Sequence, residues 1–227
     1  MALLSYVPRL LSDPSTANSY PARHMVVALH GTASEPAAFT QLSRTLRSRG
    51  VALRAPFYGK RGTAGVQECA EEVASLIDGL CSPNHTTHPI GRIDIVGHSY
   101  GALVGLKALE LVRPETAEKV HHLVGAGGAW RGTGRKAWLR PDWLVRGVLG
   151  DSFVELQRYR EAPLAPPHIR VVSIVTDNDR AVPAWSSRWG EVIEVSGASH
   201  SALPKLTSEI VNAVSYTHLR AHETDSY

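Results

Sequence analysis

Short apolar runs alternate with amphipathic segments along most of this chain, and no other feature of the sequence constrains its fold as strongly. Residues 25–30 (MVVALH) are apolar almost throughout, which is typical of a strand buried on both faces of a sheet. Residues 64–80 instead repeat apolar positions every three or four residues, which is the pattern of a helix with one buried face. The alternation predicts an α/β fold, with a mostly parallel sheet and helices on both of its faces.

Six strands and four longer helices follow from the same pattern. We expect strands at residues 25–30, 51–56, 92–96, 119–124, 169–176 and 191–195, and helices at 36–48, 64–80, 101–112 and 203–212. Residues 127–168 contain Trp130, Trp138 and Trp143 but no clear strand, so we expect them to form an insert between two strands. Residues 1–213 would then form a single domain, as is usual for a chain of 227 residues.

The segment VSYTHLRAHETDSY, at residues 214–227, differs in character from the rest of the chain. It has no apolar periodicity, and it follows a well-patterned helix abruptly. The string VSYTHLRAHET looks like a sequencing adaptor that has been translated in frame. We therefore expect residues 214–227 to be a non-native tail outside the fold.

The net charge and the apolar runs of the chain limit which kinds of partner it could bind. The formal net charge is only +3 and no dense basic stripe accompanies it, so the sequence does not indicate a nucleic-acid partner. No apolar run approaches the roughly 18 residues of a membrane span.

Cys69 and Cys81 lie at opposite ends of one expected helix, roughly 18 Å apart, so we expect free thiols, which fits a reducing compartment. Without a basic N-terminal region to suggest a secretory signal, we expect a cytoplasmic protein; the oligomeric state stays open.

Residues Gly97-His98-Ser99-Tyr100-Gly101 carry the strongest chemical signal. They match the pattern G-x-S-x-G, with an apolar strand (IDIV) directly before them and an amphipathic helix directly after them. In that setting the serine lies on a sharp, strained turn, and small residues two positions away on either side let the strand and the helix approach. Gly97 and Gly101 meet this need, so Ser99 is the candidate nucleophile. A glycine-rich turn without catalysis is the alternative.

A second signal is the sequence His30-Gly31-Thr32, directly after the first expected strand. Attack by a serine on an acyl carbonyl develops negative charge on oxygen, and stabilising it needs preorganised donors such as backbone N–H groups. We expect one donor from Tyr100, at the N-terminus of the helix after Ser99, and the other from Thr32. For His30 itself, the alternative is a histidine that packs the loop.

A third signal is the order of the residues that follow Ser99, an acid and then a histidine. His200, after the last strand, would take the proton from Ser99, and an aspartate after the preceding strand would hold its imidazole. Both positions lie at C-terminal strand ends, where open α/β sheets place their chemistry. Two aspartates compete for the acid role. We favour Asp179, in the pattern Asp-x-x-Val-Pro, over Asp177, which is closer to the strand end and would only cap the turn.

The remaining histidines are weaker candidates. One of His121 and His122, within an expected strand, should pack in the core, and His85 and His88 lie in a proline-containing loop. No cluster of Asp, Glu or Cys with ligand spacing accompanies them, so we expect no metal site.

Residues 25–212 resemble the α/β-hydrolases, and more narrowly the small bacterial class 2 lipases and esterases. Beside the pattern around Ser99, the resemblance rests on HGT at residues 30–32, on APFYGKRGTAG before the second helix and on LVGAGGAWRGT after the strand that follows Ser99. It implies hydrolysis of a small-molecule carboxylic ester without a cofactor. Two departures from those lipases are Ala102, where they usually have a second glycine, and the lack of a secretion signal.

The sequence thus predicts ester hydrolysis through an acyl-enzyme on Ser99, with His200 as the base and Asp179 as the orienting acid. The backbone amides of Thr32 and Tyr100 would bind the oxyanion. An acyltransferase that uses the same residues is one alternative. A hydrolase fold that only binds a small ligand is another, because fold alone does not establish function.

The expected insert suggests a lid. Its tryptophans and basic residues suit a boundary between an apolar surface and water, so we expect residues 127–152 to cover the site. Trp130 and Trp138 would then contact the acyl part of the substrate. Packing of the tryptophans onto the sheet is the alternative.

Overall fold

The computed structural model describes residues 23–82, 90–134 and 141–215, and within them the strands form one six-stranded sheet. The spatial order is β2-β1-β3-β4-β5-β6, and every neighbouring pair is parallel. The strands are β1 (His24–Leu29), β2 (Ala52–Arg54), β3 (Arg92–His98), β4 (Val120–Ala126), β5 (Arg170–Thr176) and β6 (Glu191–Val195). The predicted α/β fold with a parallel sheet is therefore confirmed.

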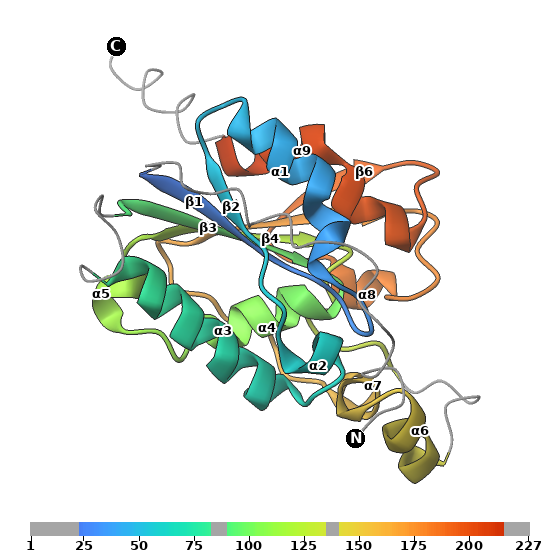
Figure 1. Cartoon of the computed structure of the whole chain (residues 1–227). Helices are drawn as coiled ribbons and strands as arrows, with labels where there is room; N and C mark the ends of the chain where they lie inside the picture. Colours follow the sequence, from blue (N-terminus) through green and yellow to red (C-terminus); the bar gives the residue numbers. More distant parts are fainter. Residues whose placement is uncertain (1–22, 83–89, 135–140, 216–227) are drawn as a thin grey trace.

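Helices cover both faces of the sheet, as predicted (Figure 1). The four longest of those that pack on it are α1 (Thr40–Arg47), α3 (Val66–Cys81), α4 (Tyr100–Leu109) and α9 (Thr207–Ser215). Buried residues of α3 and α4 form one core with Val27 and Leu29 of β1, and those of α1 and α9 form a second core with Val26 and Ala28. Successive side chains of a strand point to opposite faces, so a sheet buried on both sides reads as an unbroken apolar run.

The remaining helical elements have four to eight residues each. They are η3 (Pro36–Phe39), α2 (Gly59–Gly62), α5 (Pro114–Ala117), α6 (Asp142–Val148), α7 (Asp151–Arg158), α8 (Ala184–Ser187) and η4 (His200–Lys205). The expected insert thus contains two short helices, α6 and α7, which lie beyond the end of the sheet near α2 (Figure 1). Two contacts tie α7 to the body: Ser152 N donates to the Thr63 carbonyl at 3.2 Å, and Glu155 Oε2 accepts from Val66 N at 2.7 Å.

The C-terminal helix differs from the expectation at both ends. Residues 200–205 form the 3-10 helix η4, which contains Pro204, and α9 begins only at Thr207. Val214 is buried in α9, and its carbonyl accepts a hydrogen bond from Arg92 at 2.5 Å. The predicted tail boundary at residue 214 is therefore too early. Most of the predicted tail, residues 216–227, lies outside the described residues.

Two further expectations concern the cysteines and membranes. Cys69 and Cys81 lie in α3 and are both free, as predicted. Within the described part of the chain, no helix combines the length and the apolar character needed to cross a membrane.

Candidate active site

Ser99 lies on a strained turn between β3 and α4, which is the geometry expected from the G-x-S-x-G pattern. Its φ of 53° and ψ of −117° fall outside the regions that residues with a side chain ordinarily adopt. Such a conformation persists only where the surrounding structure holds it. Here Ser99 N donates to the Ala126 carbonyl at 3.1 Å, and the Ser99 carbonyl accepts from Ala129 N at 3.1 Å.

The glycines on either side of Ser99 are required by close backbone contacts. A Cβ on Gly97 would lie 2.3 Å from the Ala102 backbone, and a Cβ on Gly101 would lie 2.2 Å from the Leu29 carbonyl oxygen. Neither contact leaves room for a methyl group. The small residues that the sequence places here therefore allow α4 to pack directly against β1 and β3.

The loop after β1 lies beside the nucleophile candidate. A Cβ on Gly31 would be 3.3 Å from Ser99 Cβ. The Thr32 N–H shares a rigid peptide plane with the Gly31 carbonyl, which accepts a hydrogen bond from His30 Nδ1 at 3.0 Å. On the other side, α4 begins at Tyr100, whose N–H belongs to the first turn, where helix N–H groups lack intrahelical acceptors and the dipole favours negative charge.

Asp179 and His200 form the contact expected of an orienting acid and a base. His200 Nδ1 donates to Asp179 Oδ2 at 2.7 Å, and Asp179 Oδ1 accepts from the N–H groups of Ala181 and Val182, each at 2.8 Å. Burial raises the pKa of Asp179, but the hydrogen bonds from His200 and from these backbone groups outweigh burial and lower the pKa overall. Asp179 is therefore an ionised acceptor for the imidazole, and backbone N–H groups hold its second oxygen.

Asp177 has a different environment. Its side chain is exposed, and Oδ1 accepts from Gly197 N at 2.9 Å in the loop that leads to His200. The N–H of Gly197 lowers the pKa of this carboxyl. Asp177 thus stabilises the loop and makes no contact with the imidazole, which agrees with the favoured assignment of Asp179.

Ser99 and His200 come from the ends of β3 and β6. Ser99 is 8% exposed and the His200 side chain is 17% exposed, so both lie at the edge of the buried interior. The described residues contain no hydrogen bond between Ser99 Oγ and His200. Catalytic hydrogen bonds are often long without substrate and tighten in its complex.

The structure describes three other histidines that were candidates from the sequence, and two of them, His30 and His122, are buried. His30 is buried, its ring stacks on Tyr58 with 4.4 Å between centroids, and burial lowers its pKa to about 4. Of the neighbouring pair, His122 is buried and His121 is exposed, so one of them packs, as predicted. His85 and His88 lie outside the described residues, and within those residues no group of three His, Cys, Asp or Glu side chains could hold a metal ion.

The expected contact of Trp130 with substrate does not fit its position in the structure. Its side chain is fully buried, and Nε1 donates to Ser173 Oγ of β5 at 3.0 Å. The indole meets Trp189 edge-on, with 5.1 Å between ring centroids. Trp130 therefore packs the start of the insert onto the sheet. Trp138 lies outside the described residues, whereas Trp143 of α6 is 73% exposed.

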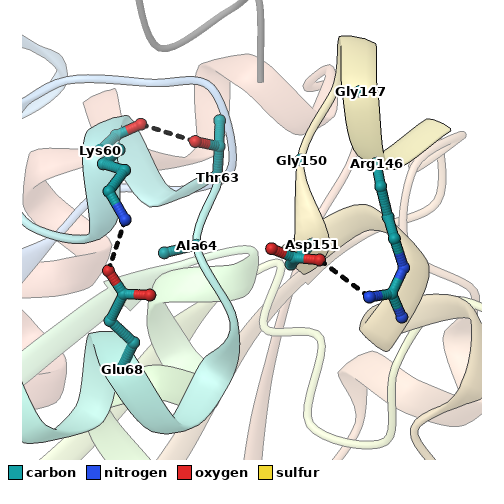
Figure 2. Close-up of a pocket in the computed structure, with 8 residues that line it drawn as sticks. All are labelled: Lys60, Thr63, Ala64, Glu68, Arg146, Gly147, Gly150 and Asp151. Atoms are coloured by element: carbon teal, nitrogen blue, oxygen red, sulfur yellow. Dashed lines mark hydrogen bonds and ion pairs between the residues drawn. The ribbon is translucent and has the colours of Figure 1, made fainter. Parts of the chain in front are cut away.

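A polar pocket of about 500 Å³ opens where the insert meets the body of the domain (Figure 2). Its lining residues are Lys60, Thr63, Ala64, Glu68, Arg146, Gly147, Gly150 and Asp151. Two ion pairs stand on opposite sides of it, Lys60–Glu68 at 2.7 Å and Arg146–Asp151 at 3.1 Å (Figure 2). Thr63 follows Gly62, where a Cβ would lie 2.8 Å from the Gly31 carbonyl oxygen. The pocket therefore borders the segment that packs against the loop of residues 30–32.

Sequence reasoning missed a buried polar cluster around Asp94 of β3. This carboxylate is fully buried and accepts from His24 Nε2 at 2.6 Å and His122 Nδ1 at 2.9 Å, and Arg92 NH2 lies 3.1 Å away. Asp94 is near the start of β3, whereas Ser99 follows the end of that strand, so the cluster is separate from the candidate site. A lone aspartate in an otherwise apolar strand was the available signal, because a buried charge needs partners.

Comparisons with known proteins agree with this architecture. The model of the alpha/beta hydrolase family matches residues 26–205. Similar solved structures include the thioesterase RedJ of the prodiginine pathway in Streptomyces coelicolor, with a TM-score of 0.59 and 19% identity over 90% of this chain and 88% of that one. Est1E from Butyrivibrio proteoclasticus, solved with ferulic acid, gives 0.61 and 16% identity over 87% and 92%.

A monoacylglycerol lipase from Paleococcus ferrophilus gives a TM-score of 0.56 and 19% identity over 86% of this chain and 93% of that one. At such identities the likeness shows the fold alone. A search of curated proteins finds no match. The family match, however, spans most of the chain and includes the HGT loop, the turn at Ser99 and the loop that carries His200. The chain therefore belongs to the alpha/beta hydrolase family.

Proposed function

We propose that this chain hydrolyses carboxylic acyl esters through a covalent acyl-enzyme on Ser99. The observation that carries the proposal is the 2.7 Å hydrogen bond between His200 and a buried, ionised Asp179, in a fold that also holds Ser99 on a strained turn. A histidine held in one tautomer by a carboxylate is the base that a serine nucleophile requires. The strained turn presents the hydroxyl in the manner of a nucleophile elbow.

Acylation would proceed as follows. Ser99 Oγ attacks the ester carbonyl while His200 Nε2 takes the hydroxyl proton, and Asp179 stabilises the resulting imidazolium. The negative charge moves to the carbonyl oxygen, where the N–H groups of Thr32 and Tyr100 donate hydrogen bonds. The C–O bond of the ester then breaks, and His200 returns the proton to the departing alcohol.

Deacylation repeats the same steps with water. His200 takes a proton from a water molecule, the resulting hydroxide attacks the acyl carbonyl, and the same two N–H groups stabilise the second oxyanion. Collapse of this intermediate releases the carboxylic acid and returns the proton to Ser99 Oγ. We expect the Ser99–His200 hydrogen bond to form in the substrate complex.

The test is turnover of p-nitrophenyl esters of rising acyl length by the wild type and by two variants. We expect Ser99→Ala and His200→Ala each to lower kcat by roughly 10⁴-fold or more, because the three side chains act as a unit. Thermal unfolding should change little, since neither side chain fills the core. More than a few per cent of residual activity in Ser99→Ala would contradict the assignment.

Two further measurements separate the alternatives. A fluorophosphonate probe should label the wild type but not Ser99→Ala, whereas absence of both labelling and turnover would indicate a protein that only binds a ligand. Product analysis with an added alcohol distinguishes hydrolysis from acyl transfer. Ester product in large excess over free acid, at modest alcohol concentration, would identify an acyltransferase.

A further inference from the structure

His98 lies between His200, the candidate base, and the loop of residues 30–32, which carries the N–H of Thr32 proposed to bind the oxyanion (the oxyanion loop). It ends β3, directly before Ser99, and is only 8% exposed. Its ring lies 4.8 Å from the His200 ring, centroid to centroid, at an angle of 40°. On its other side, a Cβ on Gly31 would lie 3.2 Å from His98 Nδ1. His98 thus lies beside both the candidate base His200 and Gly31, the residue that precedes Thr32.

The hydrogen bonding of His98 fixes its tautomer. Nε2 lies 3.1 Å from the carbonyl oxygen of His200, and a carbonyl can only accept, so Nε2 carries the proton and donates. Nδ1 is then a bare acceptor, buried without a partner among the described residues. A buried polar atom without a partner is costly, so its presence beside Ser99 calls for an explanation beyond packing.

His98 also stays neutral while His200 exchanges protons. The pKa of His98 is lowered to about 4, mainly by burial and in second place by the neighbouring His200. Asp179 and His30 are the other titratable groups that act on it, the first raising the pKa and the second lowering it. A neutral neighbour adds no repulsion when His200 becomes an imidazolium, whereas a cation at this distance would oppose that charge.

We propose that His98 is a positioning residue that holds the start of η4 through the His200 carbonyl and so sets the imidazole of His200 against Ser99. The proposal rests on the function proposed above. In this proposal His98 exchanges no proton itself, and its effect on the imidazole passes through the backbone of His200. Loss of its hydrogen bond should therefore misplace the base without weakening substrate binding.

The experiment compares three variants at this one position. The amide nitrogen of His98→Gln is as far from the backbone as Nε2 and can still donate to the His200 carbonyl, whereas that of His98→Asn is too short. His98→Leu keeps apolar volume and removes the donor. We expect kcat on p-nitrophenyl butyrate to fall roughly 10- to 100-fold in His98→Asn and His98→Leu, with KM within about threefold, as for a small misplacement of a catalytic group. His98→Gln should retain kcat within about threefold of the wild type.

Thermal unfolding of each variant checks the fold, and the Asn and Gln pair remains decisive where His98→Leu does not fold. Equal kcat in the Asn and Gln variants would overturn the proposal, as would a loss that appears only in KM. The proposed function is tested separately: activity that survives in Ser99→Ala or His200→Ala would contradict it. Where those two variants are inactive and His98→Asn turns over at the wild-type rate, only the positioning role is wrong.

Discussion

Asp177 and Asp179 are two positions apart, yet only one of them reaches the imidazole. Replacing Asp179 with Asn leaves an amide in the place of the carboxylate, which no longer stabilises a charged His200 and can favour the wrong tautomer. We expect Asp179→Asn to lower kcat by roughly 10³- to 10⁴-fold. Asp177→Asn keeps an oxygen that can accept from Gly197, so kcat should change by less than about threefold, as for an exposed capping group.

Steady-state kinetics on one p-nitrophenyl ester, with circular dichroism as a check on folding, compares the two variants. They form a matched pair, since the substitution is the same and the positions are neighbours. An equal loss of kcat in both variants would mean that the acid has been assigned wrongly.

Some site residues could be predicted from the sequence because a local pattern marks them. Others could not, because their roles depend on contacts that form only in the folded chain. Ser99, Asp179 and His200 each follow the end of a strand and carry a local pattern, so the sequence could place them. The role of Trp130 depends on Ser173, 43 residues further along the chain, and no local pattern reveals that partner. His98 belongs to the recognised G-x-S-x-G pattern, but its contact with the His200 carbonyl exists only in the folded chain.

Among the elements, α2 is a left-handed turn rather than an ordinary helix. Its four residues have φ between 51° and 70°, and two of them, Lys60 and Arg61, carry side chains that disfavour this region by roughly 1–2 kcal/mol each. Hydrogen bonds hold it in place, from Gly62 N to the Tyr58 carbonyl at 3.0 Å and from Gly59 N to Glu72 Oε2 at 2.9 Å. Its last residue packs against the Gly31 carbonyl, whose peptide plane also carries the Thr32 N–H.

Gly62→Ala tests whether this turn supports the oxyanion loop. The new Cβ would lie 2.8 Å from the Gly31 carbonyl oxygen, so the peptide must tilt and the Thr32 N–H with it. Gly50→Ala is the control, since Gly50 has a similar φ of 73° but nothing within 4 Å of its Cβ position. Both variants should lose roughly 1 kcal/mol of stability from backbone strain, whereas only Gly62→Ala should lose roughly 10- to 100-fold in kcat. If both variants retain the wild-type kcat, α2 does not position the loop.

The sequence predicted strands more completely than short helices. A strand buried on both faces needs an apolar run, which is visible in the chain, and all six expected strands are present in the sheet. The helices α6 and α7 are each only about two turns long. They depend on contacts such as that of Glu155 with the start of α3, which no local pattern encodes.

Across the whole molecule, the two ends of the sheet carry different groups of polar residues. The C-terminal strand ends carry Ser99 and His200, and the opposite end carries the cluster around Asp94. That cluster joins β1 through His24, β3 through Arg92 and β4 through His122, and Arg92 also reaches the last turn of α9. Its members come from separate strands, so the sequence could suggest that Asp94 needs partners but not which ones.

We therefore expect Asp94→Asn to lower the free energy of unfolding without changing the catalytic rate of the folded protein. Removing one partner of a buried charged cluster costs roughly 3–5 kcal/mol, which corresponds to a fall in Tm of about 10 °C for a domain of this size. Asp151→Asn is the control, because its ion pair with Arg146 is about half exposed on both sides and should contribute less than about 1 kcal/mol. Activity per folded molecule should be unchanged in Asp94→Asn.

The pH dependence of the stability difference between the wild type and Asp94→Asn gives a sharper test. Burial raises the pKa of Asp94, but hydrogen bonds from His122 and His24 and the nearby positive charges outweigh burial and hold the pKa well below its usual range. A carboxyl group whose pKa is lower in the folded state stabilises the fold fully above its unfolded pKa of about 3.9 and loses that contribution as the pH falls towards the folded value. Urea unfolding should thus give a difference in unfolding free energy between the wild type and Asp94→Asn that narrows as the pH falls below about 4. A difference that widens below about pH 4, or one that at about pH 5 is no larger than that of Asp151→Asn, would mean that the Asp94 cluster does not hold the strands and α9 together.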